Sequence, residues 1–176
     1  MIRLLRHAVL AMLLCAIAPL FCGAAQPTAP KSAAVMELEL IDDMSAYEDP
    51  AVIDAENRRI TLTSEALRRE LDQRALYRVV DNRPAADLIA SLKARENLRD
   101  CNGCEIDIGK ALGADVIVIG WVQKVSNLIL NINLQVKDVR TGEMLYAKSV
   151  DLRSNTDDSW LRGIRHLLTN MAEENH

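Results

Sequence analysis

The clearest alternation of apolar and polar residues lies in the second half of the chain. Residues 116–122 are apolar at both alternating positions, which is typical of a strand covered on both faces. Residues 128–137 then alternate strictly, and residues 144–152 return as a third strand after a turn at 139–143. These connections are too short for helical crossovers, so the three strands are predicted to form an antiparallel meander.

The first half of the chain is predicted to alternate strands with helices. Residues 44–60 are polar, include Pro50 and show no regular period, so we expect a loop of low order that holds a short helical turn or serves binding. Thr156 is predicted to cap a last helix whose apolar stripe includes Trp160. The other expected elements are strands at residues 35–41 and 77–80 and helices that begin at Thr63, Pro84 and Glu105.

Together these elements predict an α+β (mixed α/β) fold with two layers. The helices would pack on one face of a mixed sheet, which ends in the three-strand meander and is followed by a C-terminal helix. The polar side of residues 128–137 would then lie on the open face of the sheet.

Residues 1–25 have the features of a secretory signal peptide. Arg3 and Arg6 supply the positive charge, residues 8–21 form an apolar run, and the small residues up to Ala25 offer a cleavage site. Cleavage is therefore expected near Ala25. The sequence thus predicts an exported, periplasmic protein with no transmembrane segment after signal cleavage.

Two alternatives exist for this segment. An uncleaved membrane anchor is disfavoured because the apolar run is short for a bilayer and is interrupted by Pro19. Lipidation at Cys22 is disfavoured because Phe21 stands where lipoprotein signals place a small residue.

The remaining chain is long enough for one domain with a core. We predict a disordered linker at 26–34, a single α/β domain at 35–172 and a tail at 173–176. The signal peptide holds two of the 21 Lys and Arg residues, so the mature chain would carry 19 basic and 25 acidic residues, a net charge of −6. An acidic chain argues against nucleic acid as a partner, because phosphate binding needs a basic face.

Two of the four cysteines, Cys101 and Cys104, would remain after cleavage. In an exported chain, two thiols three positions apart predict one disulfide. The alternative is a redox-active dithiol, since a thiol at a helix N-terminus has a stabilised thiolate. No proline follows Pro84, so the proline that faces the dithiol in thioredoxin-like proteins has no counterpart here. A structural disulfide is the preferred interpretation.

The sequence offers little for a metal, a cofactor or catalysis. Glu105 rather than histidine follows Cys104, which excludes haem attachment. Zinc would need two further ligands, and the histidines available are His166 and His176. Asp157 and its neighbour Asp158 are explained by the helix that starts there. We therefore predict no catalytic residue, no metal and no cofactor.

A row of neutral polar side chains forms a candidate binding surface. Asn131, Asn133 and Gln135 share one side of their strand, Trp121 belongs to the preceding strand, and Asn127 ends the spacer between the two. Aromatic residues are enriched in binding hot spots, which favours a role in recognition. The same row also fits the wet side of an antiparallel sheet, with Trp121 as a core residue.

Four motifs, in order, give the chain a resemblance to a domain-of-unknown-function family of small exported bacterial proteins. The motifs are Asp100-Cys-x-x-Cys104, Leu112-Gly-Ala-Asp115, Lys124-Val-Ser-Asn-Leu-Ile-Leu-Asn131 and Asn155-Thr-Asp-x-Ser-Trp160. The broader architecture is similar to the amino-terminal domain of TolB and to lipoprotein activators of penicillin-binding proteins. The resemblance implies a non-enzymatic role in the envelope, with an association to periplasmic alcohol oxidation. Ser154 stands where the family pattern has glycine, so the turn before the last helix is expected to differ.

From these observations we predict a non-enzymatic accessory or binding protein of an envelope or periplasmic oxidation system. It would contact an unknown periplasmic or envelope protein through its sheet or through residues 44–60. Two alternatives stay open. One is thiol–disulfide exchange by Cys101 and Cys104, and the other is a small-ligand carrier with an apolar pocket between helices and sheet.

Overall fold

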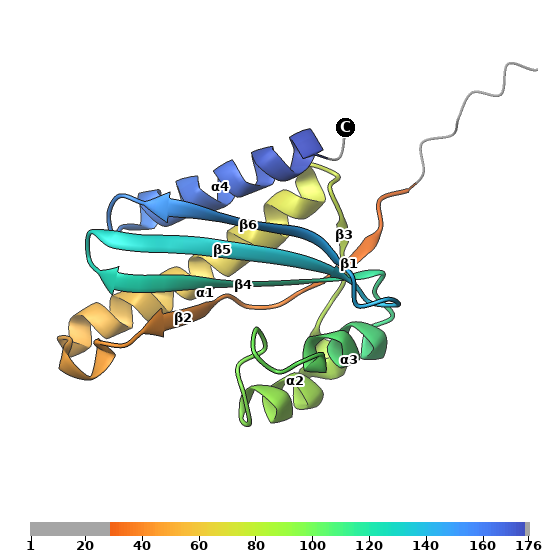
Figure 1. Ribbon diagram of the computed structural model, residues 1–176, viewed down its shortest axis with the longest axis horizontal. Helices are drawn as coiled ribbons and strands as arrows, with labels where there is room; N and C mark the ends of the chain where they lie inside the picture. The colour runs from red at the N-terminus through yellow and green to blue at the C-terminus, as the bar shows by residue number, and fades with distance from the viewer. Residues whose placement is uncertain (1–28, 175–176) are drawn as a thin grey trace, which may run out of the picture.

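The computed structural model describes residues 29–174 (Figure 1). The predicted signal peptide, Cys22, the cleavage site near Ala25 and His176 lie outside these residues. The elements of the described range are β1 (Ser32–Val35), β2 (Glu39–Asp42), η1 (Ser45–Tyr47), α1 (Pro50–Gln73), β3 (Arg78–Val79), η2 (Arg83–Ala85), α2 (Ala86–Lys93), α3 (Cys104–Ala111), β4 (Val116–Ser126), β5 (Ile129–Asp138), β6 (Met144–Leu152) and α4 (Asp157–Glu174).

All strands of the described chain belong to one mixed sheet in the order β3-β1-β4-β5-β6, and β2 also pairs with β4. β1 pairs in parallel with β3 and β4, and β2 also runs parallel to β4. β4, β5 and β6 run antiparallel, with Trp121 opposite Asn133 and Asn133 opposite Ser149. The α+β class, the mixed sheet and the antiparallel meander are confirmed.

The helices cover both faces of the sheet, which corrects the prediction that they pack on one face. α1 and α4 pack together against the main core, where Leu67 of α1 and Ile164 of α4 meet Val118 and Ile132 of the sheet. α2 and α3 lie on the opposite face (Figure 1), where Ile108 packs near Ile117 and Ile119. Residues 116–122 are therefore apolar at both parities because helices cover β4 on both sides.

The strand predicted at residues 35–41 is two strands, β1 and β2. β1 begins at Ser32 and all four of its residues are buried, so the fold starts inside the segment that was predicted as a linker. Val35 lies opposite Val118 and Glu39 lies opposite Trp121. The chain therefore advances by four residues where β4 advances by three. This extra residue is a bulge, and it reverses the side on which the following residues lie.

The bulge places Met36 and Leu38 in different cores, whereas the sequence pattern predicted them on one face. The backbone N–H of Leu38 donates to the Ser64 hydroxyl of α1, at 2.9 Å, instead of to a strand. Gly120 makes room for Leu38, because a Cβ at this position would lie 2.6 Å from Leu38 Cδ2 and 2.8 Å from the Asn133 carbonyl oxygen. The first two strands therefore depend on residues that are distant in sequence.

α1 starts at Pro50, so the predicted loop at 44–60 is wrong for most of its length. Asp49 is the N-cap and its Oδ1 accepts a hydrogen bond from the N–H of Ala51 at 2.8 Å. Thr63, which was predicted as the cap of this helix, is buried in its middle. The helix was missed because its inward face includes the polar residue Glu56, which interrupts the apolar period.

The other predicted elements agree with the structure within a few residues. The Thr156 hydroxyl accepts a hydrogen bond from the N–H of Ser159 at 3.3 Å, which confirms the predicted cap of α4. Trp160 is fully buried in the main core. None of the helices in residues 29–174 combines the length and the apolar composition that a membrane span requires.

Candidate functional site

A buried lysine joins three carboxylates near the end of β4. Lys124 shares the parity of the core residue Val122 and only 1% of its side chain is exposed. Its Nζ lies 2.9 Å from Asp42 Oδ2, 2.8 Å from Glu48 Oε1 and 2.7 Å from Glu56 Oε1. These partners come from the end of β2, the connection before α1, and α1 itself. Lys124 thus connects β4 to three segments that lie far from it in the sequence.

The environment keeps Lys124 charged. Burial by itself lowers the pKa of Lys124, but hydrogen bonds to Glu48, Glu56 and Asp42 outweigh this effect and hold its pKa above the ordinary value. The ammonium group therefore carries its proton throughout the neutral pH range, and it offsets the negative charge of the carboxylates around it. Replacing Lys124 would leave buried charge without a partner.

Asn155 extends this cluster to the end of β6 and the start of α4. Its Nδ2 donates to Glu56 Oε1 at 2.5 Å and to Asn127 Oδ1 at 3.0 Å. Its Oδ1 accepts hydrogen bonds from Trp160 Nε1 at 3.1 Å and from an Arg59 guanidinium nitrogen at 3.0 Å. We call the set of Lys124, Asp42, Glu48, Glu56 and Asn155 the lysine network.

Sequence reasoning missed the lysine network as a site, although two of the family motifs supply its residues. Lys124 begins one motif and Asn155 begins another. The available signal was the position of Lys124 in the alternation of β4, which places its side chain on the same face of the sheet as the core residues Val118 and Val122. An inward lysine needs a buried acidic partner, but the sequence does not say which of the chain's carboxylates supplies it.

Exposed apolar side chains lie on the two connections that adjoin the lysine network. Tyr47 is 83% exposed in η1, and Leu128 is 74% exposed in the turn between β4 and β5. Asp42 pairs with Lys124, so η1 and this turn both follow the ends of paired strands, and both lie toward the left end of the molecule in Figure 1. We call this set the apolar end, and it consists of Met44, Tyr47, Val125, Leu128 and Ile129.

The surroundings of the apolar end are acidic. Residues 42–54 contain five carboxylates and no lysine or arginine. Lys124 is the basic residue that contacts them from β4, and it is buried. A hollow of about 450 Å³ lies next to this end, between the first turns of α1 and the β6–α4 connection, and Arg59, Asn127 and Asn155 contribute to its lining.

The candidate polar surface occupies a different part of the molecule. The register places Trp121 opposite Asn133, and residues 119 and 123 opposite Gln135 and Asn131. Trp121, Asn131, Asn133 and Gln135 are all partly exposed. They lie on the face of the sheet where α2 and α3 pack, but these helices cover that face only near β1 and β4. Asn127 is separate from them, because it lies in the turn and its side chain bonds Asn155. A binding role for this surface stays a prediction.

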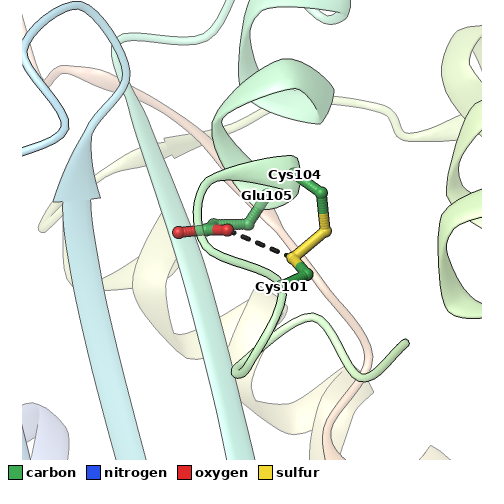
Figure 2. Close-up of side chains that lie close together, drawn as sticks. All are labelled: Cys101, Cys104 and Glu105. Atoms are coloured by element: carbon green, nitrogen blue, oxygen red, sulfur yellow. Dashed lines mark hydrogen bonds between the residues drawn. A yellow bond between two sulfur atoms is a disulfide. The ribbon is translucent and has the colours of Figure 1, made fainter. Parts of the chain in front are cut away.

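Cys101 and Cys104 form a disulfide that closes the turn before α3 (Figure 2). Their Cα atoms are 5.6 Å apart, and Asn102 and Gly103 between them have positive φ angles of 49° and 114°. Glycine at the second position accepts this left-handed conformation without a steric penalty. The two cysteines are partly buried against the second core.

Glu105 lies beside this disulfide and is only 2% exposed. Its Oε1 binds Lys137 Nζ of β5 at 2.6 Å, and its Oε2 accepts from the N–H of Gly103 at 3.1 Å. The same Oε2 is 3.4 Å from Cys101 Sγ (Figure 2). A disulfide sulfur carries no proton, so this contact is a hydrogen bond only when Cys101 is reduced.

The disulfide turn could bind a metal only after reduction. Ligand atoms of Cys101, Cys104 and Glu105 lie within 4.8 Å of one another, but thiolates and not disulfide sulfurs ligate metals. Glu105 is already engaged by Lys137. His166, the described histidine considered as a ligand, is exposed on α4 and is not part of this cluster.

Similar folds occur among solved structures. The C-terminal domain of LpoB from Salmonella enterica aligns with a TM-score of 0.51 and 16% identity, over 74% of this chain and 88% of that one. LpoB from Escherichia coli aligns with a TM-score of 0.51 and 13% identity, over 72% and 59% of the two chains. TolB from Acinetobacter baumannii aligns with a TM-score of 0.44 and 12% identity, over 83% and 29%. At these identities the likeness to LpoB concerns the fold alone, and the TolB score is too low to support an argument.

No curated protein matches the chain. The family model DUF3280, described as "Protein of unknown function (DUF2380)", matches residues 31–171, and the chain therefore belongs to this family.

Proposed function

We propose that this protein is an exported, non-enzymatic accessory protein that binds another envelope protein through its apolar end. The observation that carries the proposal is that five exposed apolar side chains lie on two connections at the same end of the fold. Exposed apolar residues on a soluble domain are usually scattered, whereas a contiguous group marks an interaction site. Tyr47 is the best candidate for an anchor, because tyrosine is enriched among binding hot spots.

The lysine network supports the proposal because it fixes the backbone beneath this surface. The segment before α1 is bound to Lys124 through Glu48, and the β4–β5 turn is bound to Asn155 through Asn127. A surface that is already ordered loses little conformational entropy when it binds. The apolar residues are therefore presented on two connections whose positions are set by buried polar contacts.

The charge around the apolar end indicates the chemistry of the partner. Two of the five carboxylates in residues 42–54, Asp42 and Glu48, pair with the buried Lys124. The three exposed ones, Asp43, Asp49 and Asp54, would attract a surface that carries lysine or arginine around an apolar centre. We therefore expect the partner to present a basic rim, and we expect binding to weaken as salt screens these charges. The narrower prediction, that the partner belongs to an envelope or periplasmic oxidation system, comes from the family resemblance and is part of this proposal.

Position-specific photo-crosslinking tests the proposal. A photoreactive residue is placed at Tyr47 or at Leu128 in the full chain in its native cell, and at Thr141 as a control in the β5–β6 turn, which is exposed but lies outside the apolar end. We expect a discrete adduct with another protein from the first two positions and none from Thr141. The adduct at Tyr47 should be lost in a Leu128→Asp background and retained in a Leu145→Ser background.

Leu145 is a matched control because it is an exposed apolar residue on β6, at 42% exposure. Equal adducts from all three positions, no adduct at all, or an adduct formed only between two copies of this chain would each contradict the proposal. An adduct that survives Leu128→Asp would show that the contact does not depend on the apolar end.

A further inference from the structure

We propose that a second site, a hollow between α1, α2 and the β1–β2 connection, binds a small amphipathic carboxylate. The hollow has a volume of about 410 Å³, within the range of small-molecule sites. Its apolar lining includes Met36, Ile89 and Leu98. The site involves none of the residues of the apolar end, so the proposal does not rest on the proposed function.

The hollow exists because α2 presents small side chains on this side. Ala86 and Ala90 line it, and they leave space that a leucine would fill. On the opposite wall the bulge after β1 brings Met36 into the second core, where Leu98 joins it. Met36 and Leu98 are almost fully buried and form the floor of the hollow, whereas the more exposed Ala86, Ile89 and Ala90 supply open apolar surface. It fits the hydrocarbon part of a ligand.

The polar part of the lining is rich in cations. Arg68, Arg83 and Lys93 contribute to it, against the single carboxylate of Glu37. This excess of positive charge stands out in a chain that carries 25 acidic and 21 basic residues. A negatively charged group is therefore the complementary ligand.

Arg68 is the cation best placed to bind that group. Arg83 is paired with Asp81 at 2.6 Å, and Lys93 lies 3.8 Å from Glu37. Within residues 29–174, Arg68 makes no ion pair, and its Nε donates to the Val35 carbonyl at 3.2 Å. This bond orients the guanidinium group, and the terminal nitrogens remain available for a bidentate contact with a carboxylate.

Asn82 adds a requirement for a hydrogen-bond donor. Its Nδ2 donates to the same Val35 carbonyl at 2.7 Å, which fixes the orientation of the amide. Its Oδ1 is buried and has no hydrogen-bond partner among the described residues. Buried acceptors are normally satisfied. Asn82 also lines the hollow, and a small shift of its side chain would let a hydroxyl group next to the ligand's carboxylate supply the missing donor. A short hydroxy acid with an alkyl chain therefore matches the site best.

Calorimetric titration of the purified mature chain tests this site with three probes: 3-hydroxyoctanoate, octanoate and 1-octanol. We expect 3-hydroxyoctanoate to bind with the highest affinity. Octanoate should bind more weakly, and octanol at least about tenfold more weakly than octanoate, because it lacks the charge that Arg68 recognises. Equal affinity for octanoate and octanol, or no heat of binding with any probe, would overturn the proposal.

Two variants and one control complete the test. Arg68→Gln should weaken octanoate binding about tenfold with little effect on octanol, and Ala90→Phe should abolish binding of both by filling the hollow. Arg69→Gln removes the exposed neighbouring arginine, which does not line the hollow, and should leave binding unchanged. Circular dichroism verifies that each variant is folded, and the two site variants report independently. Unaltered binding in the folded Ala90→Phe variant would overturn the proposed location.

Discussion

Two regions of this molecule are stabilised in different ways. One depends on contacts between residues that are distant in sequence, and the other on a covalent link within one turn. At the end near η1, the buried Lys124 joins Asp42, Glu48 and Glu56, which lie 68 to 82 positions away in sequence. At the α3 end, the covalent link between Cys101 and Cys104 spans three positions. The non-covalent network therefore organises the tertiary structure, whereas the disulfide shapes one turn.

The energetic consequence follows from loop closure and desolvation. A disulfide stabilises by restricting the unfolded chain, and this effect is small for a short ring. A buried charge cluster contributes little when it is complete, but it is costly to leave incomplete. We therefore expect the lysine network to be the more sensitive of the two, and four measurements test this comparison.

The largest effect is expected from Lys124→Met. This change leaves Asp42 and Glu56, both nearly fully buried, without their cationic partner. We expect a loss of about 3–5 kcal/mol in the free energy of unfolding, measured by urea denaturation. Lys110→Met is the control, because Lys110 is 62% exposed and should change stability by less than about 0.5 kcal/mol. A loss below about 1 kcal/mol for Lys124→Met would reverse the comparison.

Removal of the disulfide should have a smaller effect. In the loop-entropy description, the double variant Cys101→Ser with Cys104→Ser loses about 2 kcal/mol in the free energy of unfolding. Chemical reduction of the unmodified protein should produce a loss of similar size. If the double variant were less stable than Lys124→Met, the covalent link would be the main constraint on the fold.

The reduction potential of the pair distinguishes a structural disulfide from an exchange site. A structural bridge should have a potential below about −300 mV in equilibrium with glutathione, whereas exchange proteins lie between about −120 and −270 mV. We expect the lower value, because Cys101 and Cys104 are partly buried against the second core. A potential near those of disulfide isomerases would support thiol–disulfide exchange instead.

The smallest effect is expected at Asp115, which connects the turn after α3 to β1. Its Oδ2 accepts hydrogen bonds from the Ser32 hydroxyl at 2.6 Å and from the Ser32 N–H at 2.7 Å. These bonds hold the pKa of Asp115 below its usual value. Their stabilisation is therefore present above the ordinary aspartate pKa and is lost as the pH falls through the lowered value.

Asp115→Asn should accordingly reduce the difference in unfolding free energy between neutral and acidic pH. Because Asp115 is exposed, we expect this change to be well below that of Lys124→Met. Asp107→Asn, at an exposed position of α3, is the control and should leave the acid dependence unchanged. An identical acid profile for Asp115→Asn and the unmodified protein would show that the Ser32 contacts do not stabilise the fold.

The meander could be predicted because its signal is local. Strict alternation over residues 128–137 fixes which side chains face the core, and short connections force antiparallel pairing. The same locality explains the correct prediction of α4, where Thr156 caps the helix and Trp160 begins its apolar stripe. Each of these features depends on residues within a few positions of one another.

The predictions that failed involve polar residues on the inside of the fold. The first half of α1 was read as a loop because Glu56 stands where an apolar residue was expected, and its partner Lys124 is 68 positions away. Met36 and Leu38 were placed on one face because the bulge depends on Ser64 and Gly120. A single sequence does not show which distant group satisfies a buried polar atom.

By itself the sequence therefore determined the α+β class, the meander, the cap of the last helix and the cysteine pair. The tertiary structure alone decided the start of α1, the division of the first strand, the two-sided cover of the sheet and the lysine network. Alternation, caps and short loops act between neighbours in the chain, whereas ion pairs and buried hydrogen bonds form between residues that only folding brings together.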